Sequence, residues 1–211
     1  MSAHPKSRIL WPAAFACLLL AGCNIVPDKR EIRIYSAQPT VQPDAAWPRV
    51  ASQLVVQRPD AGRLTDSSRI IVQPEPGELQ VYQGAAWSQP VPDMVQDAVL
   101  RLLQDSGKVA GTARRGGGIA GDYDLAMDIR RFQSEYTGAV APSIVVEISA
   151  TMIRNDQNRV VAQDVCSARV PAAGTSVAEV AAAFEQALGA ASRDIAGWSL
   201  RAMQSGTAPA R

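Results

Sequence analysis

The sequence predicts an α+β fold: a two-layer domain in which two long helices pack on one face of a mixed, mostly antiparallel sheet. The first observation is the alternation of apolar residues over residues 144–152, followed by a turn-forming tetrad at 155–158 and a second strand-like run at 159–170. This pattern is typical of a long β-hairpin. The second observation is a C-terminal stripe of apolar residues spaced three and four apart, which is typical of an amphipathic helix. Because the elements come in the order strands, helix, strands, helix, two layers are favoured.

The N-terminal half of the domain is expected to begin with short strands. They are predicted at residues 32–35, 53–56, 69–72 and 79–82. The loop after the first strand contains Pro39, Pro43 and Pro48, so it cannot supply regular ladder hydrogen bonds. A turn through Pro74, Pro76 and Gly77 joins the last two strands.

From Pro92 the apolar period changes to that of a helix, with Met94, Ala98 and Leu102 on one face and a predicted end at Gly107. Strands are then expected at 108–114 and 123–132, before the hairpin. The final helix follows Thr175 and Ser176, and its apolar stripe comprises Val177, Ala181, Phe184, Leu188, Ala191, Ile195 and Trp198. The alanines in the stripe favour packing on the sheet, although such a stripe could also form a seam between protomers of a homo-oligomer.

The N-terminus has the features of a bacterial lipoprotein signal. Lys6 and Arg8 precede an apolar run that ends in Leu20-Ala21-Gly22-Cys23. The run is shorter than the roughly 20 residues that span a bilayer, and the small residues suit peptidase cleavage before Cys23. We therefore expect acyl chains, including palmitate, on Cys23. An ordinary signal peptide or a plain membrane anchor is the alternative.

These features predict four segments: a signal peptide at 1–22, a lipid-anchored tether at 23–31, one α+β domain at 32–203 and a disordered tail at 204–211. The signal peptide removes Lys6, Arg8 and no acidic residue, so the formal charge falls from +1 to −1. This balance argues against nucleic-acid binding. The basic pairs Arg114-Arg115 and Arg130-Arg131 are interpreted as solvated surface.

Catalytic residues are not expected. The only histidine, His4, lies in the signal peptide, which excludes histidine-dependent catalysis and His-based zinc sites in the mature chain. Asp122, Asp124 and Asp128 share one strand face and are interpreted as a wet surface rather than a calcium or carboxylate site.

Neither the glycine run nor the remaining cysteine indicates a cofactor site. Residues 116–118 form a Gly-Gly-Gly run without a following Gly-Lys-Ser/Thr, so a flexible loop is favoured over a phosphate cradle. Cys17 leaves with the signal peptide, and Cys166 is expected to be a small buried hydrophobe, with pairing to another chain as the alternative. The sequence thus predicts no metal and no cofactor beyond the covalent lipid on Cys23.

Several segments in order also carry a family resemblance. They are the lipobox, Arg33-Ile34-Tyr35-Ser36, Ser68-Arg69-Ile70-Ile71-Val72, Leu79-Gln80-Val81-Tyr82, Trp87-Ser88-Gln89-Pro90, Leu102-Leu103-Gln104-Asp105-Ser106-Gly107, Tyr123-Asp124-Leu125, Arg131-Phe132 and the final helix with Trp198. Over residues 32–200 the chain resembles the ABC-type transport auxiliary lipoproteins, a group that includes the paraquat-inducible PqiC lipoproteins.

The resemblance implies a non-catalytic auxiliary or docking component of an MCE-type ABC lipid-transport system. Its implied partners are a membrane-anchored MCE-domain protein and the ABC permease and ATPase. Asn24, in place of Asp after the cysteine, favours the outer membrane, facing the periplasm, over the inner membrane. The alternatives to the transport role are an envelope-structural or assembly lipoprotein and a periplasmic enzyme. Trp87 and Trp198 are interpreted as packing residues rather than lipid contacts.

Overall fold

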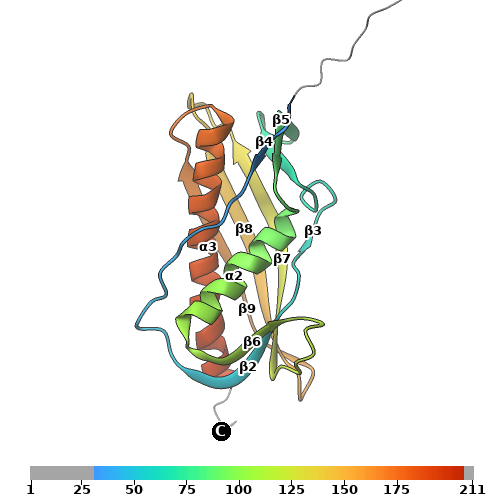
Figure 1. The fold of residues 1–211 in the computed structure, drawn as a ribbon, viewed down its shortest axis with the longest axis vertical. Coiled ribbons are helices and arrows are strands. Elements are labelled where there is room, and N and C mark those ends of the chain that lie inside the picture. Colours follow the sequence, from blue (N-terminus) through green and yellow to red (C-terminus); the bar gives the residue numbers. More distant parts are fainter. Residues whose placement is uncertain (1–30, 207–211) are drawn as a thin grey trace, which may run out of the picture. The chain divides into compact units, whose positions relative to one another are not determined.

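The structure is a computed structural model that describes residues 31–206. The predicted signal peptide, Cys23 and all of the tether except Glu31 lie outside the described residues. Within that range nine strands form one mixed sheet and two helices cover one face of it, as the sequence predicted. Figure 1 shows the helices in front of the sheet.

The long strands of the sheet are antiparallel. β7 (Tyr123–Glu135) pairs with β8 (Ser143–Arg154), which pairs with β9 (Arg159–Pro171). Ile129 lies opposite Ile148 whereas Phe132 lies opposite Val146, so β7 carries a bulge between them. This extra residue shifts the side-chain alternation and keeps Phe132 in the core on the far side of the bulge.

Short strands join the other edge of β7 in parallel, one after another. They are β2 (Val50–Val56), β3 (Asp60–Ala61) and β4 (Arg69–Gln73). β6 (Val109–Arg114) extends β2 in parallel, β5 (Gln80–Trp87) pairs antiparallel with β4, and β1 (Arg33–Tyr35) is parallel to β5. The parallel pairs and β3 were not predicted, because single-strand patterns do not reveal a pairing partner.

Both helices form where the sequence predicted them. α2 (Val91–Ser106) has Pro92 in its first turn and ends at Gly107, whose φ of 58° is left-handed. α3 (Val177–Gly206) begins with a capping box: the backbone N–H of Glu179 donates to Ser176 Oγ at 3.3 Å, and Glu179 Oε2 accepts from the Ser176 backbone N–H at 3.1 Å. The prediction of a disordered tail from residue 204 was wrong at its start, because the helix continues to Gly206. Residues 207–211 lie outside the described range.

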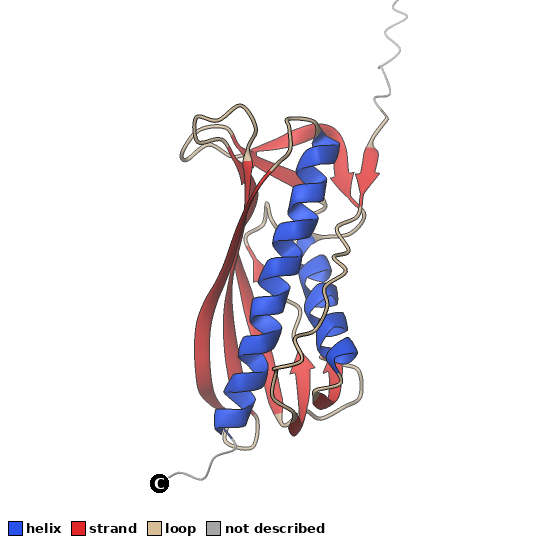
Figure 2. Cartoon of the chain, turned by 90° about the vertical axis from the view of Figure 1, so that its left-hand side faces the viewer, coloured by secondary structure: helices blue, strands red, loops and turns tan. Residues whose placement is uncertain are grey.

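The core lies between the sheet and the two helices. Phe184 of α3 stacks on Phe132 of β7 with ring centroids 4.9 Å apart, and Trp87 meets Phe184 edge to face at 5.2 Å. Seen from the side in Figure 2, α3 runs along the length of the curved sheet. The apolar stripe of α3 therefore packs in the core, as expected, except that Val177 at its start and Trp198 at its end are only partly buried.

Residues 36–49, named here the strap, run between α2 and α3 and form no strand of the sheet (Figure 2). Tyr35, Ala37, Pro39, Val41 and Pro43 are buried or half-buried, whereas the residues between them are exposed. This period of two is that of an extended chain with one face packed. Trp47 is buried near the end of the strap. The predicted proline-rich loop is thus a packed segment.

Candidate functional site

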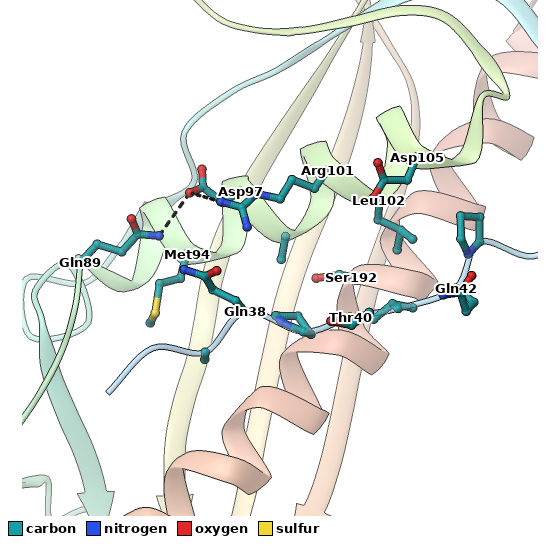
Figure 3. Close-up of a pocket in the computed structure, with 15 residues that line it drawn as sticks. Gln38, Thr40, Gln42, Gln89, Met94, Asp97, Arg101, Leu102, Asp105 and Ser192 are labelled. Atoms are coloured by element: carbon teal, nitrogen blue, oxygen red, sulfur yellow. Dashed lines mark hydrogen bonds and ion pairs between the residues drawn. The ribbon is translucent and has the colours of Figure 1, made fainter. Parts of the chain in front are cut away.

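A groove of about 470 Å³ lies between the strap and α2 (Figure 3). Gln38, Thr40 and Gln42 line it from the strap, and Met94, Ala98, Leu102 and other residues line it from α2. A second hollow on the other side of the strap is lined by α3 residues, including Glu185 and Arg193. The strap therefore divides the surface over the helices into two cavities.

Asp97 is the most extensively bonded charged residue of the groove. It accepts a hydrogen bond from Gln89 Nε2 at 3.3 Å and lies 3.8 Å from the guanidinium of Arg101. Arg114 of β6 also donates to Asp97. Figure 3 shows Gln89, Asp97 and Arg101 side by side along the wall. Two arginines neutralise the carboxylate of Asp97, and the same wall also carries the carboxylate of Asp105.

Ser192 of α3 lies in the groove and is almost fully buried, and its hydroxyl has no hydrogen-bond partner within residues 31–206. The groove as a whole is lined by amide, hydroxyl, methylene and charged side chains, a mixture that suits binding. Sequence reasoning missed this groove because it treated residues 36–49 as a proline-rich loop and assigned it no packing. The alternation from Tyr35 to Pro43 was the signal.

The three aspartates that the sequence placed on one wet strand face do not share one environment. Asp122 and Asp128 are exposed, whereas Asp124 is buried, which corrects that prediction. Gln57 Nε2 and Asn155 Nδ2 each donate to Asp124 at 3.1 Å, and Arg115 forms an ion pair with it. Burial of a carboxylate requires such partners, and they come from a loop and a turn far away in sequence.

A further ionic network lies on the sheet around β7, β8 and β9. The buried carboxylate of Glu135 accepts from Arg169 at 3.0 Å, from Arg131 at 3.3 Å and from Gln133 at 3.2 Å. Arg131 also pairs with Glu147 directly across the strands. Glu147 holds the pKa of Arg131 above its usual value. The sequence did not predict this network, since its members come together only through the strand register.

The two arginines of each basic pair have different surroundings. Arg114 pairs with Asp97 on the helix side, while its neighbour Arg115 pairs with Asp124. Arg131 belongs to the network on the sheet, and Arg130 is exposed. The interpretation of these arginines as solvated surface holds, because Arg114, Arg115 and Arg130 are exposed and the side chain of Arg131 is 42% exposed. Three of the four also pair with particular carboxylates, which the sequence did not predict.

The other candidate residues lie in structural positions. Cys166 is buried, and burial raises the pKa of its thiol to about 11. The 116–118 glycines lie in the connection between β6 and β7, where Gly116 and Gly118 have positive φ. Trp87 is in the core. Among residues 31–206 no group of three or more histidine, cysteine, aspartate or glutamate side chains could hold a metal ion. Cys23 and His4 lie outside the described residues.

Comparisons with known proteins agree on a family. The family model described as the ABC-type transport auxiliary lipoprotein component matches residues 34–196. A crystal structure from Xanthomonas campestris, assigned to family DUF330, is 45% identical, with a TM-score of 0.80, and the match covers 82% of this chain and 98% of that one.

More distant structures share the fold. A hypothetical protein from Chlamydia trachomatis is 9% identical, with a TM-score of 0.53, over 74% of this chain and 99% of that one. Another, described only as an uncharacterized protein, is 14% identical, with a TM-score of 0.60, and the match covers 79% of this chain and 97% of that one. No protein of curated function matches the sequence.

Proposed function

Because the chain belongs to the family of ABC-type transport auxiliary lipoprotein components, we propose that it is a non-catalytic docking component of an MCE-type ABC lipid-transport system. In this proposal acyl chains on Cys23 hold it at the outer membrane, facing the periplasm. Its partners are an MCE-domain protein and, through that protein, the ABC permease and ATPase. The observation that carries the proposal is the family match across residues 34–196, which includes the sheet and most of both helices.

The bonding of three partly or fully buried carboxylates supports a non-catalytic role. A general acid or base must reach its substrate within hydrogen-bond distance. Asp97, Asp124 and Glu135 are each already paired with at least one arginine. These pairs join separate strands and helices, so they act as structural links. What remains available is a surface for binding.

Attachment through Cys23 fits the described part of the chain. Within residues 31–206 no helix is long and apolar enough to cross a membrane. A lipid on Cys23 supplies attachment without a spanning segment, because each buried CH₂ adds roughly 0.8 kcal/mol and two or more chains anchor stably. The eight residues between Cys23 and Ile32 then link the lipid-bearing cysteine to the start of the domain.

The first experiment is crosslinking of the tagged full-length protein at native expression, followed by detergent extraction and identification of what co-purifies. Recovery of an MCE-domain protein or an ABC permease is the expected result. Recovery of peptidoglycan or an outer-membrane β-barrel without any transporter component would contradict the transport role and favour an envelope-structural lipoprotein.

Anchoring is tested separately by fractionation. Cys23→Ala should leave the domain folded but release it from the outer-membrane fraction. Cys166→Ala is the matched control, because it removes the other cysteine of the mature chain and should stay with the membrane. If the Cys23→Ala protein still fractionated fully with membranes, the lipid anchor would be wrong.

A further inference from the structure

Large apolar side chains are exposed at one end of the domain. Ile32 is 64% exposed and Ile34 is 62% exposed, at the start of the domain and in β1. Val140, in the loop between β7 and β8, is 87% exposed, and Leu79, in the turn between β4 and β5, is 49% exposed. Side chains of this kind in water carry a hydration cost that a partner or a lipid phase would remove.

Strand register brings these segments to the same end. Gln73, the last residue of β4, pairs with Glu135, the last residue of β7, so the turn at 74–79 and the loop at 136–142 leave the sheet together. Ser143 pairs with Pro171, which places the beginning of α3 there as well. Figure 1 shows β1 beside β4 and β5 at this end.

The sequence limits how far this end can lie from a lipid on Cys23. Nine residue steps separate Cys23 from Ile32, and an extended chain covers at most about 30 Å over them. The 30 residues of α3 extend about 45 Å towards the opposite end of the domain. A bilayer that holds the lipid therefore meets the end that contains Ile32 first.

We propose that this end, formed by Ile32, Ile34, Val140 and Leu79, is a membrane-contacting surface that rests on the leaflet in which the Cys23 acyl chains are embedded. The inference rests on the lipid anchoring proposed above. Ile32 and Ile34 are exposed within eleven residues of the anchor and add apolar contact beside it. Contact at two separated points, β1 and the β7–β8 loop, would fix the tilt of the domain rather than only tethering it.

The charges near this surface define its extent. Arg33, exposed between the two isoleucines, suits the anionic headgroup layer. Glu75 and Glu78, in the turn beside Leu79, are exposed carboxylates that disfavour deep burial. Leu79 therefore lies at the rim of the surface, and Ile34 and Val140 are the positions that test it.

The test places a single reporter on the mature, acylated protein in vesicles of phosphatidylethanolamine and phosphatidylglycerol. Ile34→Cys and Val140→Cys carry an environment-sensitive fluorophore. Ile119→Cys and Val160→Cys are the controls, since these side chains are 51% and 49% exposed near the opposite end. Wild-type protein, whose Cys166 is buried, gives the labelling background. A quencher attached to the lipid chains should reduce fluorescence at positions 34 and 140 and leave positions 119 and 160 unchanged.

Absence of quenching at positions 34 and 140, in protein that remains bound to vesicles, would overturn the proposal while leaving the anchor intact. A blue-shifted emission without quenching would also overturn it, by showing that protein rather than lipid covers these residues. Failure of the wild-type protein to associate with vesicles would instead overturn the lipid anchor, and this proposal with it.

Discussion

Gly197 of α3 lies against Trp47 of the strap so closely that a Cβ atom at position 197 would come within 2.7 Å of Trp47 Nε1. Real Cβ atoms do not approach other atoms at such a distance, so a side chain here would displace the indole. Glycine within a helix costs roughly 0.5–1 kcal/mol relative to alanine. Alanine at position 197 would favour the helix, but only glycine leaves room there for the indole of Trp47.

Gly197→Ala should therefore destabilise the domain by about 1–2 kcal/mol, because overpacking costs 1–3 kcal/mol and outweighs the gain in helix propensity. Urea unfolding measures the free energy, and limited proteolysis reports release of the strap. Ala190→Gly, at an exposed position of α3, is the control: it should cost helix propensity without releasing the strap. A more stable Gly197→Ala protein would refute close packing of the strap.

Phe184 contacts two other aromatic residues of the core, stacking on Phe132 and meeting Trp87 edge to face. Phe184→Ala should lower the free energy of unfolding by about 3–5 kcal/mol, since the large cavity cannot collapse between sheet and helix. Phe184→Leu should cost less, because it retains most of the volume. Equal losses for the two variants in urea unfolding would argue against the cavity explanation.

The ion pair between Arg115 and Asp124 should respond asymmetrically to mutation. Arg115 is 59% exposed, so Arg115→Gln should cost less than about 1 kcal/mol. Asp124→Ala removes the acceptor of the Gln57 amide and one of the two acceptors of the Asn155 amide, which keeps its bond to the Gly121 carbonyl, and should cost about 1–2 kcal/mol. Thermal or urea unfolding of both variants measures the difference. A larger loss for Arg115→Gln would show that the charge pair, not amide satisfaction, stabilises this site.

The thiol of Cys166 should be nearly unreactive in the folded protein. Burial raises its pKa from 9.0 to about 11, so at pH 8 it is protonated as well as inaccessible. Because the folded-state pKa is the higher one, the thiol lowers stability only as pH rises from 9 towards 11. Alkylation at pH 8 should be slow in native protein and fast in urea. Rapid native alkylation would contradict its burial.

The capping box of α3 predicts an effect of acid. Hydrogen bonds from Ser176 lower the pKa of Glu179 below 4.5. A depressed pKa means that the ionised glutamate contributes stability above pH 4.5 and that this contribution is lost as pH falls through the folded-state value. The stability difference between wild type and Glu179→Gln should therefore shrink in acid. A difference that did not change between pH 7 and pH 3 would exclude the charged cap.

The sequence by itself determined the elements whose signals are local. The 143–171 hairpin, the cap at Ser176, the stop at Gly107 and the stripe of α3 follow from alternation, helix period and backbone preference, all of which act within a few residues. The lipobox and the family resemblance are likewise readable along the chain. The local patterns were enough to predict two helices on one face of a mixed sheet.

The tertiary structure alone decided which residues meet across long separations. Asp124 reads as a surface residue by its place in the alternation, yet Gln57, Arg115 and Asn155 converge on it and satisfy the buried charge. The strap reads as a proline-rich loop, yet Gly189 and Gly197 leave room for it on α3. The parallel strands depend in the same way on partners distant in the chain. Packing and strand register depend on residues that are distant in sequence. A pattern that spans about ten residues therefore cannot predict them.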